Sequence, residues 1–306
     1  MGLHPVIETI MQASREANLP AFSDGEPADA RALVAAMGSA RPPREIPALA
    51  DIQDIEIPGA HPVLARVYTP NGEVIGTIVY MHGGGWVFGD LETSHPPAAT
   101  LAAASHCRVV SVDYRLAPEH PYPAALDDVM QAVAWAGASG GPLLVGGDSA
   151  GGNLAAAATL RARTEGGPAI AGQILIYPAL DPSLDTLSHR ENGPLNYILS
   201  SRDMAWFWNH YAGEAAFADP LIAPALEGNL AGLPPAFIGV ASHDPLRDEG
   251  LAYGEKLWAA GVDVEAHVYE GMVHGFAGFL GMVDTADKAL AQMGAWALAR
   301  ARGAVS

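Results

Sequence analysis

Residues 147–151 read G-D-S-A-G and hold the serine that could best act as a nucleophile in this chain of 306 residues. The motif follows an apolar run at 142–145 and precedes an alanine-rich segment, a pattern that predicts a strand, a sharp turn and a helix. Such a turn lifts the serine hydroxyl above the end of a sheet, and only small residues fit where the two backbones approach. Ser149 is therefore a candidate nucleophile, and Gly147 and Gly151 are expected to be steric requirements. A glycine-rich turn with a purely structural role could have the same five residues. Whether Ser149 is catalytic therefore depends on whether the other residues of a catalytic site are present.

A serine hydroxyl reacts poorly at neutral pH unless a histidine accepts its proton and a carboxylate orients that histidine. In enzymes with this type of serine turn, the acid follows the serine in the chain and the histidine comes last, each on a loop after a strand. Asp244 follows the apolar run at 236–242, and His274 lies just after the strand-like run at 264–269. We therefore expect Ser149, Asp244 and His274 to act together.

Other acids and histidines lie close to these two positions. Asp248 and Glu249 fall about one turn later, where carboxylates at a helix N-terminus have an ordinary stabilising role. His267 lies within a strand-like run, and His243 precedes the acid, which is outside the expected order. These placements favour Asp244 as the acid and His274 as the base.

Three consecutive glycines, residues 83–85, follow a continuous apolar run at 77–81 that predicts a buried strand. Glycine lets the backbone turn its N–H groups toward a ligand, as an oxyanion hole requires. His82 precedes the glycines and is expected to brace the loop by hydrogen bonding, not to act as a base. A flexible loop is the alternative interpretation of the three glycines.

The elements around these residues alternate between strand-like and helix-like segments, which is typical of a mostly parallel sheet covered on both sides. Extended segments at 54–57 and 63–68 predict an antiparallel hairpin at the sheet edge. Residues 5–47 carry helical patterning without chemical motifs, so we interpret them as a cover over the main domain. Residues 181–226 interrupt the alternation with an aromatic cluster, which predicts helix packing and is compatible with a lid over an apolar pocket.

Composition limits the classes of protein that fit. The 34 acidic and 16 basic residues give a net charge of −18, which disfavours nucleic acid as a partner. The single cysteine, Cys107, excludes an internal disulfide and a cysteine-rich metal site, and its strand-like surroundings predict a buried thiol. We find no signal peptide and no apolar run long enough to span a bilayer, so we expect a cytoplasmic protein without stable membrane insertion.

Five segments in this order resemble the hormone-sensitive-lipase family of bacterial esterases: residues 82–86, 114–123, 147–153, 244–250 and 274–276. The resemblance extends from about residue 60 to about residue 280 and implies an α/β-hydrolase fold, with a mostly parallel sheet flanked by helices and a helical cap. It also implies that Ser149, Asp244 and His274 form a catalytic triad. The backbone N–H groups of three residues would form the oxyanion hole, with Gly83 as their neighbour: Gly84, Gly85 and Ala150.

The same resemblance implies a division of the chain between a catalytic domain and a cap. The catalytic domain would be formed by residues 51–180 and 227–306, and the cap by an N-terminal part at 1–50 and an insertion at 181–226. A cap of this kind is expected to shape the pocket that receives the substrate.

The sequence thus predicts a carboxylesterase that acts on short- to medium-chain acyl esters of small molecules through an acyl-enzyme, without a metal ion or an organic cofactor. An amidase, a thioesterase or a deacetylase would use the same triad, and these alternatives stay open. A ligand receptor on the same fold is a further alternative, although related plant hormone receptors have lost the histidine that this chain retains as His274. The resemblance alone suggests a possible homodimer.

Overall fold

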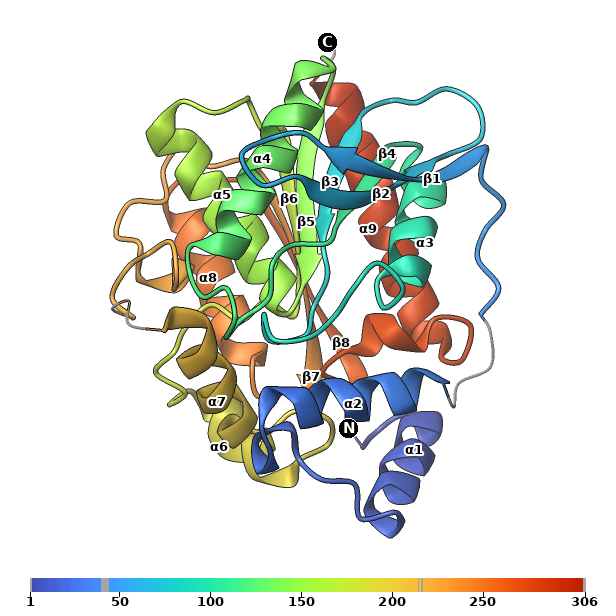
Figure 1. Ribbon diagram of the computed structural model, residues 1–306, viewed down its shortest axis with the longest axis vertical. Coiled ribbons are helices and arrows are strands. Elements are labelled where there is room, and N and C mark those ends of the chain that lie inside the picture. Colours follow the sequence, from blue (N-terminus) through green and yellow to red (C-terminus); the bar gives the residue numbers. More distant parts are fainter. Residues whose placement is uncertain (1, 40–43, 214, 216, 305–306) are drawn as a thin grey trace.

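A single sheet forms the centre of the protein, for which the computed structural model describes residues 2–39, 44–213, 215 and 217–304. Its strands are β1 Asp51–Ile57, β2 Val63–Thr69, β3 Thr77–Met81, β4 Arg108–Val112, β5 Leu143–Asp148, β6 Gly172–Ile176, β7 Ala236–His243 and β8 Val264–Val273. They lie in the order β1-β2-β4-β3-β5-β6-β7-β8 (Figure 1). The pairs β1–β2 and β2–β4 are antiparallel and the other neighbours are parallel. The expected mostly parallel sheet with an edge hairpin is confirmed.

The central strands form because their residues are apolar and often β-branched, which suits a pleated surface buried on both faces. Every residue of β3 and of β6 is buried. Cys107, which precedes β4, is buried as well, and burial raises the pKa of its thiol to about 11. The sheet is therefore a rigid support for the loops at its ends.

Helices cover both faces of the sheet and one of its ends. They are α1 Pro5–Glu16, α2 Pro27–Ser39, α3 His95–Ser105, α4 Ala124–Ala138, α5 Ala150–Glu165, α6 Leu187–Asn192, α7 Ser201–Ala212, α8 Arg247–Ala259 and α9 Asp284–Gly303. α3 and α9 pack together on one face, whereas α4, α5 and α8 cover the other (Figure 1). Within the described ranges, no helix is both long enough and apolar enough to cross a membrane.

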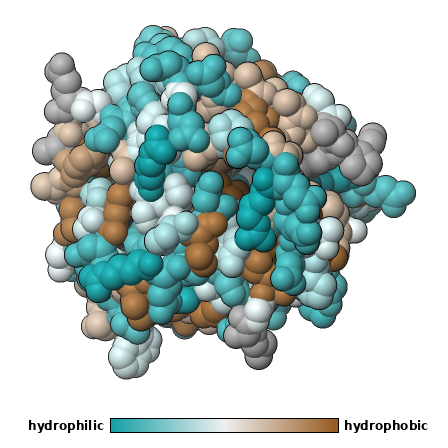
Figure 2. Space-filling model, turned by 90° about the horizontal axis from the view of Figure 1, so that it is seen from below, coloured by the Kyte–Doolittle hydropathy of each residue, from teal (hydrophilic) through white to brown (hydrophobic). Residues whose placement is uncertain are grey.

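Four helices lie together at one end of the sheet, namely α1, α2, α6 and α7 (Figure 1). The short 3-10 helix η1, Phe22–Asp24, joins this group because the N–H and hydroxyl of Ser23 donate to Asp203 Oδ1 at 2.9 and 2.7 Å. From α2, the guanidinium of Arg31 donates to the carbonyl of Val87 at 2.8 Å, in the loop after β3. Figure 2 views the molecule from this side and shows hydrophilic and hydrophobic side chains mixed over this face.

The structure moves two expected boundaries. β8 continues to Val273, beyond the expected end at residue 269, because its pairing with β7 resumes after an irregularity between Ala241 and His243. The sequence pattern also predicts a helix at 251–260, whereas α8 begins at Arg247 and has Asp248 and Glu249 in its first turn. The segments expected to form the cap and the catalytic domain include a few residues that lie outside the described part of the chain: 1, 40–43, 214, 216, 305 and 306.

Replacing Asp203 tests how firmly the N-terminal segment is held. Asp203 is fully buried, and besides Ser23 it accepts the N–H and hydroxyl of Ser200 at 3.1 and 2.6 Å, which caps α7. We expect Asp203→Ala to lower the free energy of unfolding by about 2 kcal/mol, since it removes a helix cap and leaves buried donors unpaired. It should also speed proteolysis near residue 22. The control Asp51→Ala, at an exposed position of β1, should change neither denaturant unfolding nor proteolysis; equal effects of the two variants would contradict this account.

Candidate active site

Ser149 lies in the turn between β5 and α5, with φ 57° and ψ −118°, a strained conformation for a residue with a side chain. A Cβ on Gly147 would overlap the backbone of Gly151, and a Cβ on Gly151 would overlap the carbonyl of Met81 at the end of β3. The predicted steric requirement for both glycines is therefore confirmed. The strain is maintained because β3, β5 and α5 pack too closely for the turn to relax.

The structure brings the three predicted residues together in one hydrogen-bonded chain. Ser149 Oγ lies 2.8 Å from His274 Nε2, and His274 Nδ1 lies 2.8 Å from Asp244 Oδ2. Asp244 is 0% exposed, and Ser149 and His274 are 7% and 8% exposed. Nδ1–H can donate to the Asp244 carboxylate, which leaves Nε2 to accept a hydrogen bond from the Ser149 hydroxyl. This is the arrangement that general-base activation of a serine requires.

Asp244 is held by its own loop and by α6. Its Oδ1 accepts the N–H of Leu246 at 2.9 Å, and Asn192 Nδ2 donates to its backbone carbonyl at 3.3 Å. Ser188 Oγ donates to the next carbonyl, that of Pro245, at 2.6 Å. The loop that carries Asp244 is therefore fixed by polar side chains that lie more than fifty positions earlier in the chain.

The two competing acids have a different place in the structure. Asp248 Oδ2 accepts the N–H of Ser188 at 2.7 Å, and Glu249 Oε2 lies 3.2 Å from Nε2 of the buried His189. Glu249 Oε1 also accepts the N–H of Leu180 at 2.6 Å. Both carboxylates thus connect the first turn of α8 to the segment after β6, a role that their position near a helix N-terminus did not reveal.

Two other histidines close to the predicted site residues form hydrogen bonds with neighbours in the sequence. His267 Nε2 lies 2.8 Å from Glu265 Oε1, and His243 Nδ1 lies 2.9 Å from Ser242 Oγ.

In the described ranges, no group of three or more histidine, cysteine or carboxylate side chains could hold a metal ion.

The glycine loop after β3 presents backbone donors near this turn. Gly84 and Gly85 have φ values of 119° and 57°, and a Cβ on Gly85 would overlap the ring of Phe207. Within the described part of the chain, the N–H groups of Gly84, Gly85 and Ala150 have no protein acceptor. The N–H of Gly83, in contrast, donates to Asp148 Oδ1 at 3.1 Å. The structure thus separates Gly83 from the three residues expected to hold an oxyanion.

His82 braces this loop, as predicted. Its Nδ1 lies 2.7 Å from the carbonyl oxygen of Gly83, and its ring stacks on Tyr114 with centroids 4.2 Å apart. The hydroxyl of Tyr114 donates to the carbonyl of His82 at 2.8 Å. Burial lowers the pKa of His82 to about 4, so this ring is neutral near pH 7.

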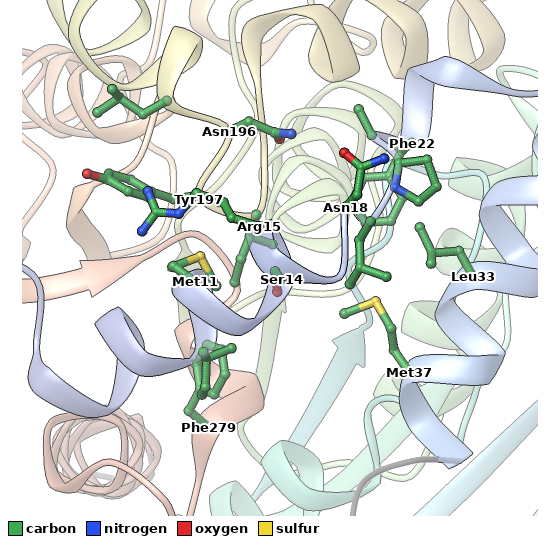
Figure 3. A pocket seen from close by; sticks show the side chains of 16 residues that line it. Met11, Ser14, Arg15, Asn18, Phe22, Leu33, Met37, Asn196, Tyr197 and Phe279 are labelled. Carbon is green, nitrogen blue, oxygen red and sulfur yellow. The ribbon is translucent and has the colours of Figure 1, made fainter.

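A cavity of about 240 Å³ lies between α1, α2 and the segment after α6. Figure 3 shows Leu33 and Met37 of α2 pointing toward Met11 of α1 across this space. Two aromatic residues also line it, Phe22 and Phe279. The ring of Phe22 contacts those of Phe88 and Phe207, with centroids 5.0 and 5.8 Å apart, and Phe207 covers Gly85 of the glycine loop. Phe279 belongs to the 3-10 helix η4, Phe276–Phe279, which begins two residues after His274.

The sheet, the strained serine turn and the loops after β7 and β8 together define an α/β hydrolase. The sequence model of the family described as "alpha/beta hydrolase fold" matches residues 78–278. The chain belongs to this family, within its hormone-sensitive-lipase branch.

Named relatives and solved structures agree with this assignment. The chain is 44% identical over 254 residues to "Esterase LipI" of Mycobacterium tuberculosis, covering 78% of each protein. It is 40% identical over 265 residues to "Carboxylesterase NlhH" of the same species, covering 81% of this chain and 82% of that protein. The crystal structure of a thermostable esterase from Pseudomonas putida matches with a TM-score of 0.90 at 30% identity over 98% of both chains. A hyperthermophilic esterase from the archaeon Pyrobaculum calidifontis matches with a TM-score of 0.86 at 36% identity, covering 98% of this chain and 99% of that one.

Proposed function

We propose that this chain is a carboxylesterase that hydrolyses small-molecule esters by two-step acyl transfer at Ser149. The observation that carries the proposal is the hydrogen-bonded chain from Ser149 through His274 to the buried Asp244. Relatives named esterases, at 39 to 44% identity, support ester hydrolysis as the reaction.

In the first step His274 Nε2 takes the proton of Ser149 as the hydroxyl oxygen attacks the ester carbonyl. The imidazolium that forms is stabilised by Asp244, which is already hydrogen-bonded to Nδ1 and so needs no rearrangement. His274 then gives the proton to the departing alcohol, and the acyl group stays on the serine oxygen.

The negative charge on the carbonyl oxygen would be held by backbone N–H groups of Gly84, Gly85 and Ala150. Their lack of protein acceptors supports this role, because a donor that is already paired could not serve the oxyanion. Ala150 is the first residue of α5, so the positive end of that helix dipole adds to the stabilisation. A water molecule, deprotonated by His274, then releases the acid and restores Ser149.

We further propose that residues 1–50 and 181–226 form a cap whose cavity receives the carbon chain of the substrate. The cavity of about 240 Å³ is smaller than the roughly 300 to 1,000 Å³ of pockets for drug-sized ligands. Its size and its lining by Met11, Leu33 and Met37 support a preference for short- to medium-chain acyl esters.

Replacing Ser149 tests the proposed reaction. With p-nitrophenyl acetate and butyrate, Ser149→Ala should lower kcat by roughly 1,000-fold or more, because the acyl-enzyme can no longer form. Ser201 offers a matched control, because it belongs to a second hydrogen-bonded chain of a serine, a histidine and a carboxylate. Its Oγ lies 2.8 Å from His189 Nδ1, and Nε2 of the same ring lies 3.2 Å from Glu249 Oε2. Ser201→Ala should retain kcat within about fivefold of wild type. Unchanged turnover in Ser149→Ala would refute the proposal.

Filling the cavity tests the chain-length preference. Leu33→Trp should lower kcat/KM for p-nitrophenyl octanoate by about tenfold or more and leave the value for the acetate within about twofold, because only the longer chain needs the space. Ala35→Trp, at an exposed position of the same helix, is the control and should change neither value. An equal loss with both esters would show that the cavity does not receive the chain.

A further inference from the structure

Asp148, which immediately precedes the serine, joins the glycine loop to the end of β5. Its Oδ1 accepts the hydroxyl of Tyr80 at 2.8 Å and the N–H of Gly83 at 3.1 Å. Gly83 opens the glycine loop, so this one oxygen connects the serine turn to the backbone that leads into the proposed oxyanion hole. The acyl-transfer steps derived above make no use of this carboxylate.

The other carboxylate oxygen faces the histidine side of the site. The hydroxyl of Tyr177 lies 3.5 Å from Asp148 Oδ2, and its ring packs edge-on against His274 with centroids 4.8 Å apart. Tyr177 has a φ of 36°, an unusual conformation for a residue with a large side chain. Asp148 thus contacts both the glycine loop and the ring that supports His274.

Burial makes the hydrogen bonds of Asp148 important. Desolvation raises the pKa of the Asp148 carboxyl, while the hydrogen bonds from Tyr80, Gly83 and Tyr177 lower it. These donors therefore offset part of the cost of burying the carboxyl beside the serine turn.

We propose that Asp148 is a positioning residue, which holds Gly83 and thereby the glycine loop on the serine turn. The inference rests on the proposed function of Ser149. Because Gly84 and Gly85 follow Gly83 directly, loss of the hydrogen bond to Asp148 would move the N–H groups that are proposed to hold the oxyanion. Tyr177 gives the carboxyl a further contact, through the ring that packs on His274.

Asp148→Asn keeps the hydrogen bonds, because the amide oxygen can still accept from Tyr80 and Gly83, whereas Asp148→Ala releases both donors. With p-nitrophenyl acetate we expect Asp148→Asn to keep kcat and KM within about threefold of wild type. Asp148→Ala should lower kcat by about tenfold or more with KM within about twofold, because the glycine loop no longer holds its N–H groups in place.

Asp51→Ala, at an exposed site, is the control and should leave kcat unchanged. An Asp148→Ala protein with the kcat of wild type would overturn the proposal, even if it unfolds at a lower temperature. Equal losses of kcat in Asp148→Asn and Asp148→Ala would also contradict it, because the first variant keeps the hydrogen bonds. Absence of ester hydrolysis in wild type would count against the proposed function alone.

Tyr80→Phe provides a second test that adds no polar group, and it applies even if Asp148→Ala does not fold. Loss of the Tyr80 hydroxyl removes one of the two donors to Oδ1, so the carboxyl that accepts from Gly83 is held less firmly. We expect kcat to fall by about threefold with KM within about twofold of wild type. A Tyr80→Phe protein with wild-type kcat at every pH would contradict the role of Asp148.

Discussion

The close approach of the serine turn to the end of β3 is the constraint on which the rest of the site depends. Gly151 lies so near the carbonyl of Met81 that no side chain fits, and Ser149 is therefore held in a strained conformation. Because β3 continues directly into the glycine loop, the same contact sets the distance between the serine and the N–H groups of that loop. Two strands and one helix thus fix the proposed nucleophile and the proposed oxyanion donors before any substrate binds.

The segment after β6 contributes more than a cover. Its helix α6 holds the loop of Asp244 through Ser188 and Asn192, and the buried contact of His189 with Glu249 ties the same helix to α8. The segment that lines the cavity with residues 195–198 therefore also holds the loop of Asp244. Substitutions of Ser188 or Asn192 are expected to affect catalysis, because these side chains fix that loop.

Much of the fold and the proposed triad could be predicted from the sequence because their signals are local. Apolar runs mark the strands, and Ser149, Asp244 and His274 each follow one, so parallel strands deliver them to the same edge. The support from α6 could not be predicted, since Asn192 and the carbonyl it binds are 52 positions apart and no short pattern links them. The same is true of Asp148, whose partners Tyr80 and Gly83 lie on β3 and in the loop after it, and of the extension of β8 beyond an irregularity in its pairing.

Covalent labelling tests the central claim, that Ser149 is the nucleophile, most directly. The native protein would be treated with a p-nitrophenyl alkylphosphonate, the released p-nitrophenol measured, and the modified residue mapped by peptide mass spectrometry. The account predicts about one p-nitrophenol released per chain, one adduct on Ser149, and loss of both in Ser149→Ala and His274→Ala. An adduct on Ser201 or another residue, or full ester turnover after Ser149 has been modified, would contradict it.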